Sequence, residues 1–536
     1  MVVRPDAAQT RLIGSHVAEV ARRTPRRIAV VEGGRRIDYG ELDREVHRVA
    51  RGLIALGVDR GDVVTIELPN WWETNVVIHA VLRIGAIPNP VVPIYRDREM
   101  RFIIAQARPK VVVVPQIFRG FDFLDMLDRL TSGATAGSSD APTVVVVRPD
   151  GAVPAHVLTY DDLPLGDDAS VDAAAGAAAA DDIALLLYTS GTTADPKGVL
   201  HDHHTLDHEN RSIIELFRLG HESTVFMGSP VTHITGFLYG VLLPPMLGAT
   251  AVLLDVWEPN GARGLIDAES CRFTVGATPF LQGLTDVYDE SGAPCPLHVF
   301  ACGGADVPSA LVRRARSVLD ATVVRVYGSS EFPTVTCSGP DDDEHLAADT
   351  DGRPIGTQIE CRIDEPDTDG VGELLARGPE LFLGYLDAAL DADAFVEDRW
   401  FRTGDLASID AEGAVTIRGR SKDIIVRGGE NISAKEIEDL LYVHPAVREV
   451  AVVAMADPVM VERACAFVVT EPGVHLELPE LVDFLDQHRL ARQKFPERLV
   501  LVDELPKTAS GKVQKFVLRA RLARPPDPTA QKDPIE

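Results

Sequence analysis

The chain has 536 residues, which is too long for one hydrophobic core and predicts two to four domains. An apolar content of 45% and a charged content of 25% are those of an ordinary soluble globular protein. The formal net charge of −28 argues against nucleic acid and anionic membranes as partners, because like charges repel.

Strand-like and helix-like segments alternate along the first part of the chain. DVVTIEL (62–68) precedes a helical segment at 72–86, and the helical REMRFIIAQAR (98–108) precedes KVVVVP. The same alternation continues through segments 249–255, 261–271, 273–279, 280–290, 297–304, 308–320 and 322–331. Continuous apolar runs separated by amphipathic helices predict parallel strands covered on both faces, and therefore a doubly wound α/β architecture.

Domain boundaries show as changes in composition. The Ala/Asp-rich stretch 166–182 is expected to be a surface connection inside the large domain. Beyond residue 420 the elements become shorter and α+β in type, so the predicted domains are 1–421 and 422–524, with a disordered tail at 525–536. In the second domain, Ser433 and Glu436 form a capping box that predicts the start of a helix.

Targeting signals and cysteine usage point to the cytoplasm. The first residues have no continuous apolar stretch typical of a signal peptide, and no apolar run is long enough to span a membrane. The six cysteines show no CxxC pair and no metal-ligand spacing, which favours buried thiols in a reducing compartment.

The stretch YTSGTTADPKG (188–198) brings many small hydrogen-bond donors and one lysine into a single loop after the apolar run IALLL. It resembles a phosphate cradle but departs from the P-loop pattern, because Gly198 follows Lys197. In doubly wound sheets ligands bind outside the carboxyl ends of the strands. This loop and the segments after TVGATP, HVFACGG and VVRVYG are all predicted to lie there.

Five further stretches join this loop. They are VYGSSE (326–331), GELLARGPELFLGYL (372–386), FRTGDLASID (401–410), GRSKDIIVRGGENISAKEIE (419–438) and LPKTASGKVQK (505–515). In this order and at these distances the motifs resemble the adenylate-forming superfamily of acyl-CoA synthetases, stand-alone adenylation domains and beetle luciferases. The resemblance covers about residues 10–522. It implies a large N-terminal domain of doubly wound α/β subdomains plus a β-rich subdomain, followed by a small mobile α+β domain.

The resemblance implies a nucleotide site with ATP and Mg2+. The phosphate-binding residues would be Thr189, Ser190, Gly191, Thr192, Thr193 and Lys197. Ala194 stands where the family usually has glycine, which puts the mobility of the loop in doubt. The other nucleotide-binding residues would be Gly304, Ala305, Tyr327, Gly328, Ser329, Ser330, Asp405, Arg420 and Lys512.

Individual roles follow from the same resemblance. Tyr327 would stack on adenine, Asp405 would accept hydrogen bonds from the ribose, and Arg420 would reach the ribose or phosphate. Glu331 would bind Mg2+, because a hard cation prefers a carboxylate oxygen. Lys512 would be the adenylation lysine that stabilises the charge developing in the first half-reaction.

The small domain is expected to rotate between two half-reactions. Lys422 resembles the hinge residue of the family, and the rotation would withdraw Lys512 from the site. Gly428 and Gly429 would then approach the thioester site, where coenzyme A binds.

The acyl pocket is expected to be apolar, with His233 as a gate. Its other predicted lining residues are Ile234, Phe237, Leu238, Gly276, Ala277, Phe280, Leu281, Gly303, Gly304, Tyr327 and Gly328. VTHITGF (231–237) has no acidic residue to pair with an ammonium, which argues against amino acids. The pocket would suit an aliphatic, alicyclic or aromatic acid of medium size, as in cyclohexanecarboxylate and medium-chain fatty acyl-CoA ligases. A larger residue at Gly303 is expected to shrink the accepted acid.

The acceptor of the acyl group is left open between two thiols. Free coenzyme A is preferred, because no carrier domain follows residue 522. The alternative is an aryl or acyl adenylation enzyme that loads a separate carrier protein. A non-catalytic nucleotide-binding protein is a more remote hypothesis, against which the retained Lys197, Glu331, Asp405 and Lys512 argue. A homodimer is neither indicated nor excluded.

Overall fold

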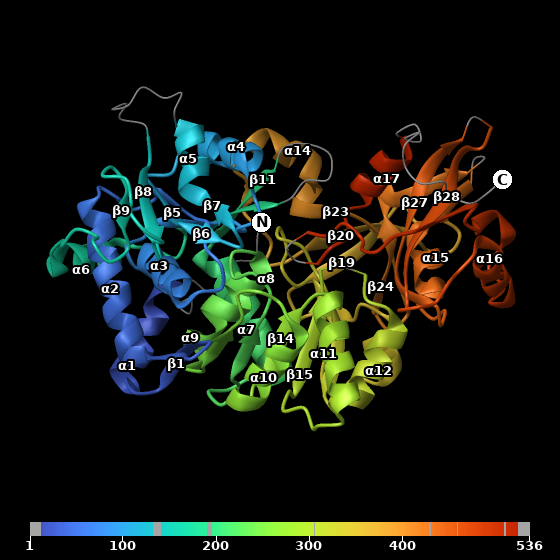
Figure 1. The fold of residues 1–536 in the computed structure, drawn as a ribbon, viewed down its shortest axis with the longest axis horizontal. Helices are drawn as coiled ribbons and strands as arrows, with labels where there is room; N and C mark the ends of the chain where they lie inside the picture. The colour runs from blue at the N-terminus through green and yellow to red at the C-terminus, as the bar shows by residue number, and fades with distance from the viewer. Residues whose placement is uncertain are drawn as a thin grey trace.

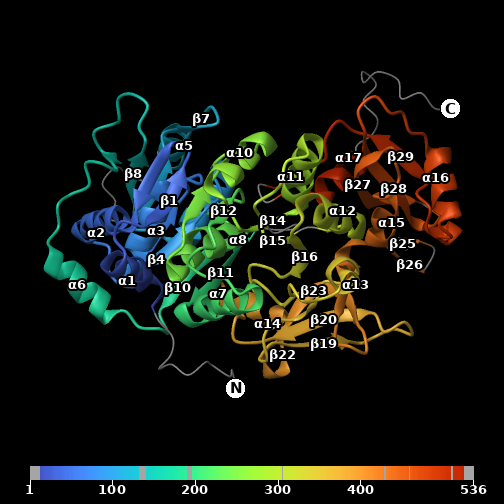
Figure 2. The same cartoon turned by 90° about the horizontal axis from the view of Figure 1, so that it is seen from below.

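The chain forms a large N-terminal part and a smaller C-terminal domain, which meet at residues 421–423 (Figure 1). The structure is a computed structural model, and it describes residues 12–131, 141–189, 196–304, 306–427, 430–457, 459–508 and 511–523. Seen from below, the C-terminal domain packs beside the helices that follow β14 and β15 (Figure 2). The expected α/β architecture with a small second domain is confirmed.

A large mixed sheet forms the centre of the N-terminal part, in the order β18-β17-β16-β15-β14-β12-β13-β1-β2. Its middle strands are parallel, β2 pairs antiparallel with β1 at one edge, and β17 pairs antiparallel with both β16 and the edge strand β18 at the other. The strands are β1 (Ile28–Glu32), β2 (Arg35–Asp38), β12 (Val225–Met227), β13 (Ala251–Leu253), β14 (Phe273–Gly276), β15 (Val299–Gly303), β16 (Thr322–Tyr327), β17 (Thr336–Cys337) and β18 (Arg353–Pro354).

Both faces of this sheet are covered, which explains its continuous apolar strands. Val323 and Val324 are neighbours on β16, yet they belong to different core clusters because successive side chains point to opposite faces. One face packs against α10 (Pro259–Glu269), α11 (Thr278–Ser291) and α12 (Ser309–Leu319), with α13 (Glu344–Asp349) beside β16. The other face packs against α7 (His203–Phe217), α8 (Ile234–Gly236), the π-helix η2 (Phe237–Leu242) and α9 (Leu243–Leu247).

A second sheet is parallel throughout, in the order β4-β3-β5-β8-β9. Its strands are β3 (Val63–Ile66), β4 (Ile87–Pro90), β5 (Val111–Pro115), β8 (Thr143–Val147) and β9 (Leu158–Thr159), and β6 (Ile117–Phe118) and β7 (Phe121–Asp122) form a hairpin beside it. The helices of this region are η1 (Ile13–Ser15), α1 (His16–Arg23), α2 (Tyr39–Ala55), α3 (Trp72–Arg83), α4 (Asp97–Ala107), α5 (Phe123–Thr131) and α6 (Asp168–Ala177).

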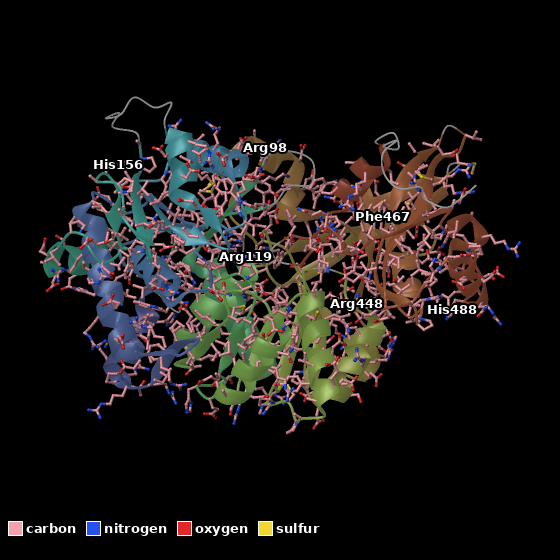
Figure 3. All side chains as sticks on the ribbon, viewed as in Figure 1. Arg98, Arg119, His156, Arg448, Phe467 and His488 are labelled. Carbon is pink, nitrogen blue, oxygen red and sulfur yellow. The ribbon has the colours of Figure 1, made fainter. Side chains whose placement is uncertain are left out.

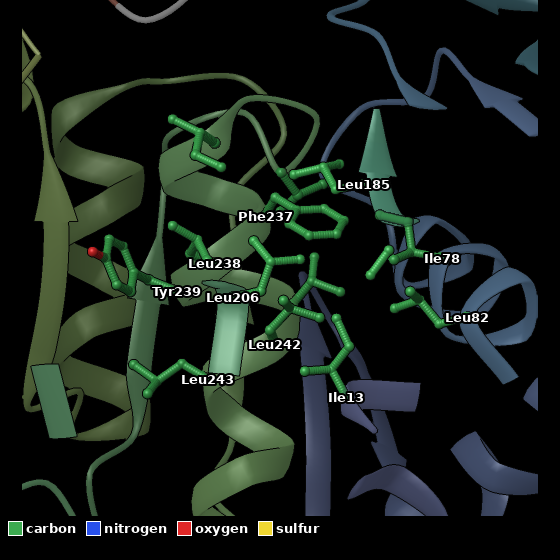
Figure 4. Close-up of a cluster of buried hydrophobic side chains, with 14 of the residues drawn as sticks. Ile13, Ile78, Leu82, Leu185, Leu206, Phe237, Leu238, Tyr239, Leu242 and Leu243 are labelled. Carbon is green, nitrogen blue, oxygen red and sulfur yellow. The ribbon is translucent and has the colours of Figure 1, made fainter. Parts of the chain in front are cut away.

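A shared core joins the two sheets. Figure 4 shows Phe237 and Leu242 from η2 facing Ile78 and Leu82 from α3, with Leu185 beside them. All of these side chains are buried. At about 1.5–3 kcal/mol for each fully buried large apolar side chain, such contacts stabilise the sheets against each other.

Two smaller sheets complete the N-terminal part. One is antiparallel and contains β10 (Ile183–Thr189), β11 (Lys197–Asp202) and β21 (Gly384–Tyr385). The β-rich subdomain has β19 (Glu360–Asp364), β20 (Gly372–Arg377), β22 (Phe395–Val396), β23 (Trp400–Ile409) and β24 (Val415–Arg420), with η3 (Ala388–Leu390), α14 (Asp391–Ala394) and η4 (Glu397–Arg399).

The C-terminal domain has its own sheet and core. Its sheet has the order β26-β25-β28-β27, and β29 pairs with β28. The elements are η5 (Ser421–Asp423), β25 (Ile424–Arg427), β26 (Glu430–Ser433), α15 (Ala434–Leu441), β27 (Val447–Asp457), β28 (Val461–Thr470), α16 (Leu478–Gln487), η6 (Arg492–Lys494), β29 (Arg498–Leu501) and α17 (Lys515–Ala523). As expected, Ser433 caps α15 by accepting from the Glu436 N–H.

The structure departs from the sequence analysis at two places. The stretch 166–182 contains a helix, α6, because Asp167 caps it and its alanines favour helix. Only Val171 of α6 is buried, which explains the weak periodicity. The run IALLL was expected in a parallel sheet with the other motif strands, but β10 pairs antiparallel with β11. Strand direction depends on the partner, which an apolar run does not reveal.

Candidate functional site: a cleft between the N-terminal part and the C-terminal domain

The carboxyl ends of β15 and β16 form the floor of the site. Gly304 follows β15 with a φ of 79°, a conformation that favours glycine. Gly328 follows β16, and a Cβ there would lie 1.9 Å from the Pro333 carbonyl oxygen, so only glycine fits this turn. The Ser329 hydroxyl accepts hydrogen bonds from the backbone N–H groups of Glu331 and Phe332, both at 3.2 Å. The predicted loop 328–331 is therefore a tight turn at a strand end.

A hydrogen-bonded chain connects β16 to the β-rich subdomain. The Tyr327 hydroxyl donates to Asp405 Oδ2 at 2.7 Å, and Arg420 Nε lies 3.0 Å from Asp405 Oδ1. Burial and the Asp405 carboxylate raise the pKa of Tyr327, so its hydroxyl remains a donor. The register of β23 and β24 pairs Asp405 directly with Arg420. Three predicted nucleotide-binding residues thus come together.

Glu331 and Lys197 approach the site from different elements. The Tyr385 hydroxyl donates to Glu331 Oε1 at 2.9 Å. Lys197 Nζ lies 4.9 Å from the centre of the Tyr385 ring, a cation–π contact. Thr189 ends β10 and pairs with Lys197 at the start of β11. Ser190, Gly191, Thr192, Thr193 and Ala194 lie between them, outside the described residues, as does Ala305.

Lys512 reaches the site from the C-terminal domain. A Cβ on neighbouring Gly511 would lie 3.1 Å from Pro279 Cγ and 3.5 Å from Ala277 Cβ, so this loop contacts the start of α11. Burial and the Arg420 guanidinium lower the pKa of Lys512 to about 8, although Asp405 and Asp306 act in the opposite direction. The structure therefore places Lys512 beside the predicted ribose-binding pair.

His233 lies close enough to Lys512 to respond to its charge. Burial and the Lys512 ammonium lower the pKa of His233 to about 4, so the imidazole is neutral near pH 7. Its Nδ1 is buried without a hydrogen-bond partner in the described part of the chain. His233 occupies the N-cap position of α8 without a capping hydrogen bond from its side chain, and the π-helix η2 begins at Phe237 directly after α8. π-helical turns are rare and often occur at functional sites.

A cavity of about 920 Å³ fills the cleft between the two parts. Among the predicted site residues, its lining contains Gly304, Tyr327, Gly328, Asp405, Arg420, Lys422 and Lys512. Figure 3 shows Arg448, a further lining residue, where the C-terminal domain faces the N-terminal part. Part of the predicted nucleotide site therefore lies in this cleft, whereas the cavity lining does not include the described residues Thr189, Lys197, Ser329, Ser330 and Glu331.

The predicted acyl-pocket residues are more deeply placed. Phe237 is fully buried in the core cluster and does not border this cavity, so its contact with a substrate stays a prediction. A Cβ on Gly276 would contact Phe280 and Phe300 at 3.3 and 3.4 Å. A Cβ on Gly303 would lie 2.3 Å from the Val326 carbonyl oxygen. A larger residue at 303 would therefore displace β16 before it could narrow a pocket.

Lys422, the predicted hinge residue, lies in the connection between two sheets. β24 pairs with β23 of the N-terminal part, and β25 pairs with strands of the C-terminal domain. Lys422 lies between them in η5. Burial and the Arg420 charge lower the pKa of Lys422. Gly428 and Gly429, predicted to approach coenzyme A, lie outside the described residues.

Sequence analysis missed charged residues on both sides of the cleft. Lys435 of α15 lies 3.6 Å from Asp306 and 3.1 Å from Asp439. Partial desolvation would raise the pKa of Asp306, whose side chain is 43% exposed, but Lys435, Lys515 and Lys512 lower it to about 2. Asp306 follows the CGGA segment, so its position at the end of a predicted strand could have indicated that it lies near the site. No local pattern could have predicted the role of Lys435, because its partner Asp306 is 129 residues away in the sequence.

Comparisons with known proteins agree with this geometry. The AMP-binding enzyme family matches residues 17–386, and the AMP-binding enzyme C-terminal domain matches residues 436–512. The medium-chain fatty-acid–CoA ligase of Escherichia coli (strain K12) is 35% identical over 515 residues, covering 94% of this chain and 89% of that protein. A salicylyl-CoA synthase / salicylate adenylyltransferase of Streptomyces sp is 34% identical over 523 residues, covering 95% and 93%. ATP-bound MatB from Rhodopseudomonas palustris superimposes with a TM-score of 0.79 at 26% identity, covering 95% of this chain and 98% of that one.

The matched family and the similar ligase define an acid–thiol ligase of the adenylate-forming class. The chain belongs to the AMP-binding enzyme family. The superfamily that the motifs indicated is thereby confirmed. No helix in the described ranges is both long and apolar enough to cross a membrane.

Proposed function

We propose that the protein is a carboxylate–CoA ligase that works in two half-reactions. In the first, a carboxylate oxygen of the acid attacks the α-phosphorus of ATP, the bond to the bridging oxygen breaks, and pyrophosphate leaves. In the second, the thiol sulfur of coenzyme A attacks the acyl carbonyl carbon, the bond to AMP breaks, and AMP leaves with the electron pair. The thiol proton passes to solvent.

The position of Lys512 carries this proposal. Two anions must meet in the first half-reaction, and a cation placed beside them lowers the barrier. Lys512 lines the same cavity as Asp405 and Arg420 although it belongs to the other domain, and its charge lowers the pKa of His233. This arrangement is the one expected for adenylation.

The neighbouring residues have complementary tasks. Asp405 would accept from the ribose hydroxyls, and the half-buried Tyr327 beside it would stack on the adenine. Glu331 fits a hard cation, because its Oε2 accepts no hydrogen bond from the described residues while Tyr385 orients Oε1. Mg2+ bound there would offset phosphate charge. Lys197 would contribute a second positive charge at the phosphates.

The acid is proposed to be apolar and of medium size. The segment 231–240 has no acidic residue, so an amino acid's ammonium would stay unpaired. Fatty acids and salicylate are named for the two relatives, and both are carboxylic acids without an ammonium group. Coenzyme A is the proposed thiol, and a carrier protein is the alternative. All six cysteines are unpaired, in keeping with the predicted cytoplasmic location.

A half-reaction experiment tests the role of Lys512. We expect Lys512→Ala to lose at least about 100-fold in acid-dependent pyrophosphate release, while thioester formation from supplied acyl-AMP changes little. Lys494→Ala is the matched control, because Lys494 pairs with Glu436 away from the cavity lining. Equal losses in both half-reactions would contradict the assignment.

A panel of acids identifies substrate and acceptor. Pyrophosphate release is measured for fatty, alicyclic, aryl and amino acids, with and without coenzyme A and with a holo carrier protein. We expect medium-size apolar acids and coenzyme A to give product. Transfer to the carrier protein alone would favour the alternative acceptor.

A further inference from the structure

Tyr385 lies between the two predicted phosphate-site residues that come from different parts of the chain. Its hydroxyl is 2.9 Å from Glu331 Oε1, and its ring centre is 4.9 Å from Lys197 Nζ. We propose that Tyr385 is a positioning residue that holds the Glu331 carboxylate with its hydroxyl and the Lys197 ammonium with its ring. This inference rests on the proposed function and deepens it.

The hydroxyl is suited to orienting a carboxylate. Tyr385 is buried, with 6% of its surface exposed. A phenol hydroxyl that faces a carboxylate oxygen at 2.9 Å is the donor of that hydrogen bond. A hydrogen bond to a charged group restricts the carboxylate to one direction. Oε2 is then the oxygen left for a cation.

The ring is suited to holding a lysine before ATP binds. Within the described residues, Lys197 forms no ion pair with a carboxylate. The face of an aromatic ring attracts an ammonium without neutralising it. Lys197 can therefore move from the ring to a phosphate without breaking a salt bridge to any carboxylate in the described ranges. A carboxylate in the place of Tyr385 would compete with ATP for that charge.

Contacts of the neighbouring backbone and side chains fix the position of Tyr385. Gly384 has a φ of 146°, and a Cβ there would lie 2.6 Å from Asp391 Oδ2. Asp391 Oδ1 accepts a hydrogen bond from the Tyr385 N–H at 2.9 Å. The Phe382 ring packs edge-on against the Tyr385 ring, with centres 4.9 Å apart. Several independent contacts thus define where the phenol points.

The same segment also holds the backbone of Glu331. The Phe382 N–H donates to the Glu331 carbonyl oxygen at 2.8 Å. From the other side, Nε2 of the buried His201 lies 2.8 Å from the Ser330 carbonyl oxygen. Burial lowers the pKa of His201 to about 4, so a neutral Nε2–H donates there. His201 belongs to β11, the strand that begins with Lys197. Tyr385 completes a frame that joins β11, β21 and the loop 328–331.

Two substitutions separate the two contacts. Tyr385→Phe keeps the ring but removes the hydroxyl, whereas Tyr385→Leu removes both. Tyr385→Met replaces the leucine variant if that protein does not fold. Tyr288→Phe is the matched control, because the Tyr288 hydroxyl donates to Asp267 at 2.6 Å and does not border the cavity.

The main measurement is ATP binding by calorimetry at increasing Mg2+ concentration, without any acid. We expect Tyr385→Phe to raise the Mg2+ concentration for half-maximal ATP binding about tenfold, since residues that orient a metal ligand typically contribute that much. At saturating Mg2+, ATP should bind Tyr385→Phe within about twofold of the wild type. Tyr385→Leu should also weaken ATP binding at saturating Mg2+ by about three- to tenfold.

The outcomes distinguish this inference from the proposed function. An unchanged Mg2+ dependence in Tyr385→Phe, or the same shift in Tyr288→Phe, would overturn the carboxylate role. Equal ATP binding by the phenylalanine and leucine variants at saturating Mg2+ would overturn the lysine role. If the wild type binds Mg·ATP but releases no pyrophosphate with any acid, the proposed function fails while the binding data still decide the role of Tyr385.

Discussion

Lys512 shows how strongly one residue depends on its surroundings. A lysine near the end of a chain is ordinarily solvated, and its charge is then constant below pH 10. Here burial and Arg420 lower its pKa to about 8, while Asp306 and Asp405 limit the shift. Its charge therefore changes within the range where an enzyme is assayed.

The pH profile of the first half-reaction should show this pKa. The charged form is the active one, so kcat/KM for ATP should fall as pH rises through about 8. Pyrophosphate release between pH 6 and 10 measures it. Because arginine stays charged up to pH 10, the Lys512→Arg variant should not show this fall in kcat/KM above pH 8, whatever its absolute rate. A wild-type profile that stays level to pH 10 would contradict the shifted pKa.

Val461 is the second residue whose conformation has a measurable consequence. It begins β28 with a φ of 70°, which is strained for a β-branched side chain, and 62% of its surface is exposed. We expect Val461→Gly to raise the free energy of unfolding of the C-terminal domain by about 1 kcal/mol, measured by chemical denaturation. Val459→Gly in the same turn lacks a positive φ to relieve and should leave stability equal or lower. A lower free energy of unfolding in both variants would show that the backbone of Val461 is unstrained.

At the scale of elements, a buried pair of carboxylates joins α7 to the segment after β20. Glu209 accepts hydrogen bonds from Tyr239 and Thr334, and Glu380 accepts from Ser212 and contacts His208. Burial raises the pKa of Glu380 to about 7, and burial together with Glu380 raises that of Glu209. The segment that starts at Glu380 continues to Phe382 and Tyr385, which hold Glu331.

This pair predicts a stability that declines as pH rises. The folded pKa of Glu380 lies above the unfolded value of about 4.5, so the folded state binds more protons between these values and its stability falls from about pH 4.5 to 7. Glu380→Gln stays neutral and should stabilise the protein by roughly 1–3 kcal/mol at pH 8, but little at pH 5. Thermal unfolding at both values measures this, with the exposed Glu222→Gln as control. A difference in stability that does not change with pH would contradict the raised pKa of Glu380.

At the scale of the whole molecule, charges hold the two parts together in one arrangement. Asp306 belongs to the N-terminal part, and the lysines around it, Lys435, Lys512 and Lys515, belong to the C-terminal domain. Lys435 is 7% exposed at its side chain and Asp306 is 43% exposed, so solvent screens part of their attraction. A rotation of the C-terminal domain would break these contacts.

Removing the Asp306 charge should therefore favour the rotated arrangement. We expect Asp306→Asn to slow acid-dependent pyrophosphate release about two- to fivefold, while thioester formation from supplied acyl-AMP stays equal or becomes faster. Asp439→Asn is the matched control, because Asp439 pairs with the same lysine within the C-terminal domain. Equal effects of the two variants on both half-reactions would show that the contact between Asp306 and Lys435 does not set the equilibrium between the two domain arrangements.

The sequence predicted secondary structure correctly where a short segment contains the residue pattern that determines it. The alternation of apolar runs and amphipathic helices predicted the strands β14, β15 and β16 and the helices between them, because both faces of that sheet are buried. The Ser433 cap was visible for the same local reason. The helix α6 was missed, since an exposed alanine-rich helix shows little periodicity.

By itself, the sequence determined the superfamily and the α/β architecture, because these depend on ordered motifs and on the alternation of strands and helices, and it predicted several residues that line the cleft. Only the tertiary structure decided that β10 lies in an antiparallel sheet, that Gly303 faces β16, and that Tyr385 joins Glu331 to Lys197. It also placed Asp306 against Lys435 and Lys512. These facts are contacts between residues far apart in the chain, and their energies depend on distance and burial, which no local pattern encodes.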